Sequence, residues 1–167
     1  EVDIQKLGSR RDPQNLRRLI AALGRSVGQA TKASELAMDV GGDDGPIAKE
    51  TLDAYLSALD RLHLIENSEA WRPHMRSRAR LRTAPVRYFV DPSLGPAALG
   101  VGSAELFADL NALGLHFEAL VIRDLRVYAQ PLDGRVDSWR DSNAKEVDAI
   151  VTVGPNNWGA FEIKLNP

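Results

Sequence analysis

The order of the periodic segments constrains the fold of this chain more than any other feature of its sequence. Apolar residues recur at helical spacing over three segments, at about 13–25, 34–40 and 48–62. Asp12 and Pro13 give the first segment a helix start, because an aspartate N-cap is followed by proline in the first turn. Two runs with strand character follow, at about 64–70 and 86–91. The first half of the chain is therefore predicted to be three helices and a hairpin.

Three helices followed by a two-stranded hairpin is the order of a winged helix-turn-helix, which we expect over residues 13–91 after a linker at 1–12. A basic segment falls where the wing of that fold would lie. Between Ala70 and Val90 there are six arginines and no acidic residue. Since the whole chain carries a net charge of −2 and this stretch carries +6, the remainder carries −8. The pattern of charge therefore carries more information than the sum.

Four of these arginines alternate along the chain: Arg76, Arg78, Arg80 and Arg82. In an extended wing they would share one face, and aligned guanidinium groups suit a nucleic-acid phosphate backbone. They could equally pair with the acidic remainder or with another protein module. The third predicted helix is a poor surface for phosphates, because its outward positions carry three acidic and two basic residues. The sequence leaves DNA and protein contacts both open. Trp71 and Tyr88 could add stacking, although packing in the core is the stronger expectation.

Several classes of protein are excluded by what the sequence lacks. The 167 residues include no cysteine, so disulfides, thiolate metal sites and a cysteine nucleophile are ruled out. This composition fits a reducing compartment, and we expect a cytoplasmic protein. No apolar run approaches about 18 residues, so no membrane-spanning helix is expected. There is no P-loop motif, and the histidines lack metal-ligand spacing. Because the chain starts at Glu1 and not at methionine, we expect a fragment of a longer protein.

The pattern changes after Asp91-Pro92, where we place a boundary. The second unit, residues 92–167, begins with a stretch rich in Gly, Ala and Pro at 93–102. Two helices are predicted next, at about 104–113, ended by Gly114, and at about 115–128. Three strands are then predicted at about 136–140, 146–153 and 157–165. The α-β-β-β order predicts an α/β unit, so the fold class expected for the chain is mixed α/β.

The last two predicted strands form a hairpin around Pro155. Side chains alternate between the two faces of a strand, so the faces follow from the numbering. If the hairpin pairs symmetrically, Asp148 lies opposite Glu162, and Glu146 lies opposite Lys164. Two facing carboxylates repel each other. Either water solvates them, or a hard divalent cation that prefers oxygen ligands lies between them.

A further carboxylate points inward from the predicted helix before these strands. Glu118 is aligned with apolar residues at helical spacing, namely Val121, Ile122 and Leu125. An unpaired charge on such a stripe is costly. The structural explanation is a basic partner such as Arg123, Arg126 or Lys164. The functional explanation is a metal ion or its bound water.

A helical glutamate followed by Asp and Glu-x-Lys on a hairpin resembles the core signature of the PD-(D/E)XK nuclease superfamily, the restriction-endonuclease-like fold. The residues are Glu118 in GLHFE, Asp148 in EVDAIV, and Glu162 and Lys164 in FEIK. The resemblance implies that Asp148 and Glu162 bind Mg2+ or Mn2+. It implies that Lys164 orients the attacking water and stabilises charge on the phosphate, and that Glu118 supports the metal indirectly. Such metals act as Lewis acids and lower the pKa of bound water.

The resemblance extends over residues 10–166. The winged helix followed by YFVDPSL, GxxFE, EVDAIV and FEIKL is similar to the C-terminal portion of a family of bacterial and archaeal AAA-type ATPases. In that family a P-loop module precedes a winged helix and a nuclease-like domain. The resemblance implies a nucleic-acid-interacting accessory region, with ATP bound only by the preceding module. The nuclease-like fold of the family normally continues with another helix and strand, so the domain is expected to be truncated here. The resemblance leaves two alternatives open, a metal-dependent nuclease site in the full-length protein or a vestigial one. The alternative is a non-catalytic module that contacts its ATPase module, a protein partner or a second copy of itself.

Overall fold

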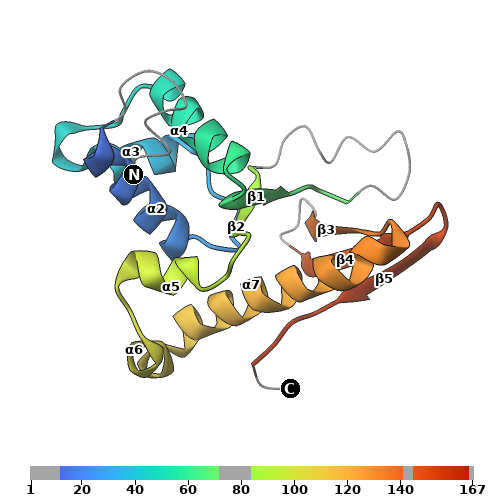
Figure 1. The fold of residues 1–167 in the computed structure, drawn as a ribbon. Coiled ribbons are helices and arrows are strands. Elements are labelled where there is room, and N and C mark those ends of the chain that lie inside the picture. The colour runs from blue at the N-terminus through green and yellow to red at the C-terminus, as the bar shows by residue number, and fades with distance from the viewer. Residues whose placement is uncertain (1–11, 72–83, 141–144, 166–167) are drawn as a thin grey trace.

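The computed structural model describes residues 12–71, 84–140 and 145–165 of the chain. Its fold is mixed α/β, as predicted, with N-terminal helices and a β-hairpin followed by a long helix and a three-stranded antiparallel sheet (Figure 1). The first three helices are α2 (Pro13–Arg25), α3 (Ala33–Gly41) and α4 (Lys49–Arg61). Each begins and ends within about two residues of its prediction, because the apolar spacing that identifies it is also what packs it. No helix in the described part of the chain is long and apolar enough to cross a membrane.

Helix α2 begins where the sequence predicted. The Asp12 side chain accepts a hydrogen bond from the Gln14 amide at 2.8 Å, and Pro13 follows the cap. This cap satisfies an amide that the first turn of a helix leaves without a partner. The apolar face of α2 then packs into a core with α3, α4 and the hairpin. That N-terminal core is built largely from fully buried leucines: Leu19, Leu36, Leu52 and Leu59.

The hairpin consists of β1 (Ile65–Ser68) and β2 (Val86–Phe89), which pair antiparallel with Ile65 opposite Phe89. The four alternating arginines, Arg76, Arg78, Arg80 and Arg82, fall between these strands in the sequence and lie outside the described residues. The backbone beyond β1 continues toward the second sheet. Ala70 forms a parallel bridge with Ser138, and the Trp71 amide donates to the Ser138 carbonyl at 2.7 Å. The hairpin therefore connects directly to the C-terminal strands.

The stretch rich in Gly, Ala and Pro is not a plain connection. It forms α5 (Leu94–Leu99), which ends at Gly100 in the left-handed conformation and is followed by α6 (Ser103–Ala108). Helix α5 lies close to α2, because a Cβ atom on Gly24 would be 3.0 Å from the Gly95 carbonyl oxygen. On its other side a Cβ atom on Gly95 would be 2.8 Å from Cε1 of His116. The glycines that suggested a loop instead allow close helix packing.

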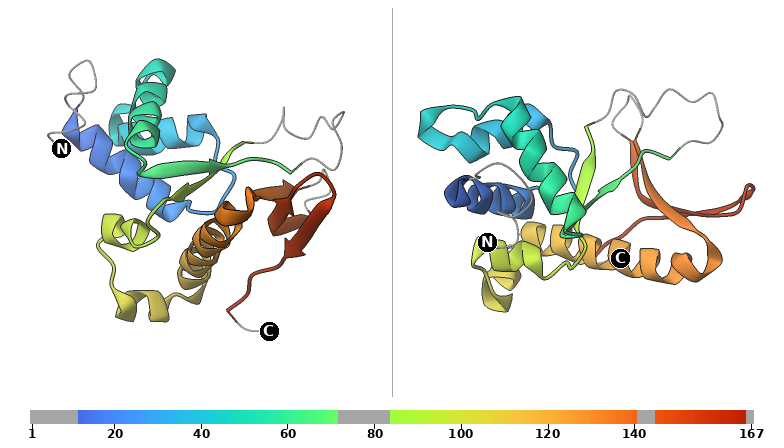
Figure 2. Two further views of the ribbon diagram at one scale, coloured as in Figure 1. Left: turned by 45° about the vertical axis from the view of Figure 1, so that its right-hand side comes forward. Right: turned by 45° about the horizontal axis from the view of Figure 1, so that its top comes forward.

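Two helices are present as predicted, but the break between α6 and α7 (Leu110–Ala129) lies at Asp109 and not at Gly114. The predicted break at Gly114 is wrong because the N-cap of α7 is Asp109. The Asp109 side chain accepts hydrogen bonds from the amides of Asn111 and Ala112, both at 3.1 Å. Gly114 lies inside the helix, where a glycine costs only about 1 kcal/mol relative to alanine. Figure 2 shows α7 running beneath both the N-terminal helices and the sheet.

The sheet has the order β3-β4-β5, formed by β3 (Arg135–Arg140), β4 (Glu146–Val153) and β5 (Asn157–Phe161). The predicted register of the last hairpin is confirmed, with Ala149 opposite Phe161. Strand β5 ends at Phe161, however, and the predicted extension to residue 165 is wrong. Beyond that point the Asp148 carboxylate accepts a hydrogen bond from the Ile163 amide at 2.7 Å. The Asp148 side chain thus accepts from the Ile163 amide where a continued strand would have used a main-chain carbonyl.

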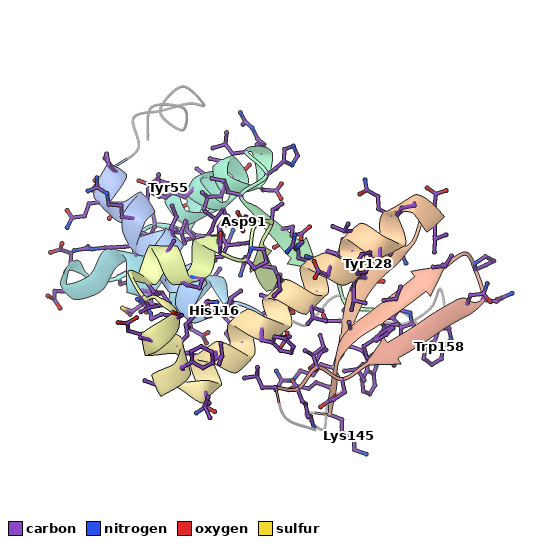
Figure 3. All side chains as sticks on the ribbon, turned by 60° about the horizontal axis from the view of Figure 1, so that its bottom comes forward. Tyr55, Asp91, His116, Tyr128, Lys145 and Trp158 are labelled. Atoms are coloured by element: carbon purple, nitrogen blue, oxygen red, sulfur yellow. The ribbon has the colours of Figure 1, made fainter. Side chains whose placement is uncertain are left out.

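A second core joins the two halves of the molecule. Val27 and Tyr88 from the N-terminal half pack with apolar residues of α7 and the sheet, among them Ala119, Ile122 and Ala149. At the far side of the sheet, Trp71 and Trp158 have ring centroids 5.0 Å apart. Trp158 on β5 and Tyr128 near the end of α7 are nevertheless mostly exposed (Figure 3). The C-terminal half therefore relies on the N-terminal half to complete its core.

Candidate functional site

A cleft of about 630 Å³ lies where the two halves of the chain meet. We call it the junction cleft. Its walls come from the β1–β2 hairpin, from α7 and from strands β3 and β4. The residues that matter for its chemistry are Gly28, Ser68, Tyr88, Glu118, Arg140 and Asp148. Two of the predicted site residues, Glu118 and Asp148, therefore face one cleft although they are far apart in sequence.

Glu118 projects from α7 into this cleft, as its position on the apolar stripe predicted. Its partner differs from the three basic residues considered from the sequence. The buried Tyr88 hydroxyl donates a hydrogen bond to Oε1 of Glu118 at 2.8 Å. Gly28 makes room for this pair, because a Cβ atom there would be 3.0 Å from the same oxygen. Glu118 thus holds α7 against β2.

Arg126, one of the expected partners, has another role. It forms an ion pair with Glu66 of β1, and its guanidinium carbon lies 5.2 Å from the centre of the Tyr88 ring. A cation over the face of an aromatic ring is attracted by its electrons. Arg126 therefore reinforces the same contact between α7 and the hairpin without neutralising Glu118.

The protonation of Glu118 is strongly affected by its surroundings. Burial raises the pKa of Glu118 from its ordinary value of 4.5 to about 7, and the nearby carboxylates of Asp148, Glu146 and Glu162 act in the same direction. The hydrogen bond from Tyr88 opposes the shift. Burial also raises the pKa of Asp148, with smaller contributions from Glu162 and Glu146. The cleft therefore disfavours its own negative charge and would be stabilised by a positive one.

Glu162 and Lys164 lie apart from the cleft lining. The Lys164 Nζ atom is 3.1 Å from Oε1 of Glu162, and both side chains are more than half exposed. The expected cross-strand pair of Glu146 and Lys164 does not form, because Glu146 lies 3.7 Å from the guanidinium of Arg140. The structure thus brings Glu118 and Asp148 together and leaves Glu162 and Lys164 as a surface ion pair.

The donor groups do not fit a ready-made metal centre. Among residues 12–71, 84–140 and 145–165, no three histidine, aspartate or glutamate side chains gather closely enough to hold an ion. Oδ2 of Asp148 accepts from Ile163, and Glu118 accepts from Tyr88. A hard divalent cation needs several converging oxygen ligands. The described residues of the cleft therefore do not fit a divalent metal ion.

The other candidate surfaces are less informative. The outward face of α4 is acidic, and its Lys49 is 2.6 Å from Asp53, so the helix offers little to phosphate groups. Tyr88 belongs to the core, as expected, and Trp71 is half-buried. The sequence missed the close approach of Gly28 to Glu118 and the hydrogen bond from Tyr88 to that glutamate. The only available signal was the alternation in β2, which turns Tyr88 inward.

Comparison with known proteins finds two family models that match separate parts of the chain. Residues 113–167 match a domain of unknown function (DUF4143), a family commonly found C-terminal to AAA ATPases in bacterial proteins. No curated protein and no solved structure was found to match the chain. Residues 1–105, more than half of the sequence, match another domain of unknown function (DUF8612). On that match, the chain belongs to the DUF8612 family and carries a DUF4143-like segment behind it.

Proposed function

We propose that this chain is an accessory C-terminal region of an AAA-type ATPase, and that it acts by binding in the junction cleft and not by cleaving nucleic acid. The occurrence of DUF4143 behind AAA ATPases supports the first part. The order of motifs from the winged helix to FEIKL supports it independently. The walls of the cleft come from both halves of the chain, so a ligand bound there would contact both.

One observation carries the second part of the proposal. Two acids of the nuclease-like signature accept hydrogen bonds that join elements of the fold, and the other two residues pair with each other on the surface. Glu118 accepts from Tyr88, Asp148 accepts from the Ile163 amide, and Glu162 pairs with Lys164. In a working site the lysine has to reach the attacking water beside the metal. Here it lies on the exposed surface and outside the cleft.

A nuclease assay tests this proposal. The full chain should leave DNA and RNA uncut in the presence of Mg2+ or Mn2+, and Lys164→Ala should behave identically. Cleavage by the wild type that disappears in Lys164→Ala would overturn the proposal and restore a catalytic site. A variant that retains the wild-type melting temperature makes the comparison valid.

A second candidate function is a metal-dependent phosphodiester site with Asp148 and Glu162 as ligands and Glu118 in support. Burial is the main cause of the raised pKa values of Glu118 and Asp148, and the neighbouring carboxylates add to it. A cation would offset both effects, which favours this candidate. Titration with Mn2+ distinguishes the two candidates. Saturable binding by the wild type that is lost in Asp148→Ala would support the metal site. Identical titrations for both proteins would remove it.

Nucleic-acid binding by the basic segment is tested separately. Four alternating arginines without nearby acidic residues favour it: Arg76, Arg78, Arg80 and Arg82. Reversing all four charges to glutamate should abolish salt-dependent DNA binding if the segment contacts phosphates. If the segment instead contacts protein, the wild type and the variant should both fail to bind DNA.

A further inference from the structure

A second groove, with a volume of about 570 Å³, lies between the C-terminal turns of α7, the hairpin and the turn that leads into β3. We call it the hairpin groove. It shares no lining residue with the junction cleft. The residues that decide its chemistry are Glu66, Val90, Arg123, Arg126, Val127 and Asp133. The segments that carry them all lie within the described part of the chain.

The two arginines of the hairpin groove differ in how fully they are paired. Arg126 forms an ion pair with Glu66, and only 18% of its side chain is exposed. Its charge is therefore neutralised inside the groove. The Arg123 side chain is 42% exposed, and within the described part of the chain its one ion-pair partner is its sequence neighbour Asp124. That pair joins Nε to Oδ1 at 3.0 Å and leaves the two outer nitrogens of Arg123 unused.

The hydrogen-bonding capacity of Arg123 is also poorly satisfied. Its Nε atom is buried, yet it makes no hydrogen bond to any described residue, because the close contact with Asp124 lacks the required geometry. Hydrogen bonds from Ser93 lower the pKa of the Asp91 carboxyl, and the charge of Arg123 adds only a smaller effect. A partly desolvated donor group without acceptors is unfavourable. Arg123 therefore has capacity for an acceptor that enters the groove from outside.

Apolar side chains lie on both sides of this guanidinium. Val90, directly after β2, and Val127, on α7, line the groove and are exposed. Leu120 is also exposed and precedes Arg123 by three residues, while Val127 follows it by four, so all three share one face of α7. Single exposed hydrophobic residues are ordinary on a protein surface. A set that flanks an incompletely paired arginine matches the composition of protein–protein interfaces, where arginine is enriched.

The charges of the groove favour a polypeptide carboxylate over nucleic acid. Glu66 and Asp133 line the same groove, so a run of phosphates would meet these carboxylates as well as Arg123. A single carboxylate could instead approach the outer nitrogens of Arg123 and form a bidentate pair. The valines would then cover an aliphatic side chain beside that carboxylate. Charge complementarity and the apolar flanks point to the same occupant.

We infer that the hairpin groove docks a short acidic segment of a partner protein. An aspartate or glutamate of that segment pairs with Arg123, and a neighbouring aliphatic side chain packs against Val90 and Val127. This inference goes beyond the proposed function, because it concerns a surface that is separate from the junction cleft. A segment held here contacts α7 and the hairpin, and thus both halves of the chain.

Fluorescence anisotropy on the full chain tests the inference with a short labelled peptide in which glutamate and leucine alternate. We expect saturable binding, which Arg123→Gln should weaken about tenfold because it removes a charge-assisted pair. Val127→Ser should weaken binding about threefold, because it removes apolar contact area. Both side chains are exposed, so we expect both variants to keep the wild-type melting temperature. If one of them unfolds, the other still decides the question.

Arg61→Gln is the matched control. Arg61 is exposed on α4, lies outside both the junction cleft and the hairpin groove, and its loss changes the net charge by the same amount. Binding by this variant should stay within about twofold of wild type, because a distant exposed charge is screened by salt. Equal weakening in Arg61→Gln and Arg123→Gln would overturn the inference, since binding would then follow net charge alone.

The comparison peptides decide which chemistry the groove recognises. A peptide with glutamine in place of glutamate, and another with serine in place of leucine, should each bind more weakly. Equal affinity for either peptide would overturn the inference, as would no binding at peptide concentrations up to about 1 mM. Binding of single-stranded DNA that is lost in Arg123→Gln would assign the groove to nucleic acid and also overturn it. The nuclease assay above tests the proposed function independently of these outcomes.

Discussion

The N-terminal helical region and the C-terminal sheet differ in how they complete their hydrophobic cores. The first encloses leucines such as Leu19 and Leu52 that are wholly inaccessible to solvent. The second leaves Trp158 and Phe161 of its edge strand 58% and 42% exposed. It completes its core with Val27 and Tyr88, which belong to the other region. The junction cleft therefore lies beside the hydrophobic core that the two regions share.

The difference has a physical origin in the elements themselves. Three amphipathic helices and a hairpin can close around one apolar centre without help. A three-stranded sheet with α7 packed against it has two edges and limited apolar surface to bury. Its edge near Ser138 is engaged by residues of the N-terminal region. The sheet is therefore held in place by the contacts that also form the cleft.

Truncation of a core leucine should have the largest effect on this comparison. Leu19→Ala should lower the free energy of unfolding by about 2–5 kcal/mol, because it leaves a cavity in a closed core. Leu110→Ala, at an exposed position on α7, should change it by less than about 0.5 kcal/mol. Urea denaturation followed by circular dichroism measures both. Equal losses would show that the C-terminal region is packed as tightly as the N-terminal one.

Glycine substitution at the junction should have a smaller but specific effect. Gly28 and Gly154 both have φ near +70°, at 73° and 68°. Alanine in that conformation costs roughly 1–2 kcal/mol at either position. Gly28→Ala should cost more than Gly154→Ala, because its methyl group would press on Glu118, whereas Gly154 has nothing within 4 Å. Equal melting temperatures for the two variants would contradict the close approach at the junction.

Stability should depend on pH through the cleft and not through the N-terminal core. The folded protein holds a proton on Glu118 more tightly than the unfolded chain does, since the pKa is raised from 4.5 to about 7. The stabilising contribution is therefore complete below pH 4.5 and is lost as pH rises through about 7. Asp148 acts in the same direction. Relative to Glu118→Gln, the wild type should lose melting temperature across this interval.

If the melting temperature of Glu118→Gln fell in parallel with that of the wild type, the pH dependence would come from groups other than Glu118. Asp124→Asn serves as the reference with the same change of charge. Its melting temperature should follow that of the wild type over the whole interval.

The sequence predicted the N-terminal elements well because their apolar spacing and their packing express the same periodicity. The register of the last hairpin was also predictable, since the turn around Pro155 and the alternation of side chains determine it. The end of β5 was not, because it depends on how the Asp148 carboxylate meets the Ile163 amide. Gly114 misled because a glycine inside a helix is tolerated, whereas Asp109, a preferred N-cap residue, carried the correct signal for the helix start.

The candidate site was predictable only in part. The position of Glu118 on an apolar stripe indicated burial, and the side chain is half-buried. Its partner Tyr88 lies 30 residues earlier on another element, so no local pattern could reveal it. The proximity of Asp148 to Glu118 likewise depends on how α7 crosses the sheet. Long-range packing decides which carboxylates share a cleft.

A double-mutant cycle on Tyr88 and Glu118 tests most directly the claim that the signature glutamate serves to join the two regions. Tyr88→Phe, Glu118→Leu and the double variant would be compared by urea denaturation at pH 8. A coupling energy of about 0.5–3 kcal/mol is predicted, because each single change removes one end of the same partly buried hydrogen bond. Additive losses, with no coupling, would contradict the account and release Glu118 for a role in catalysis.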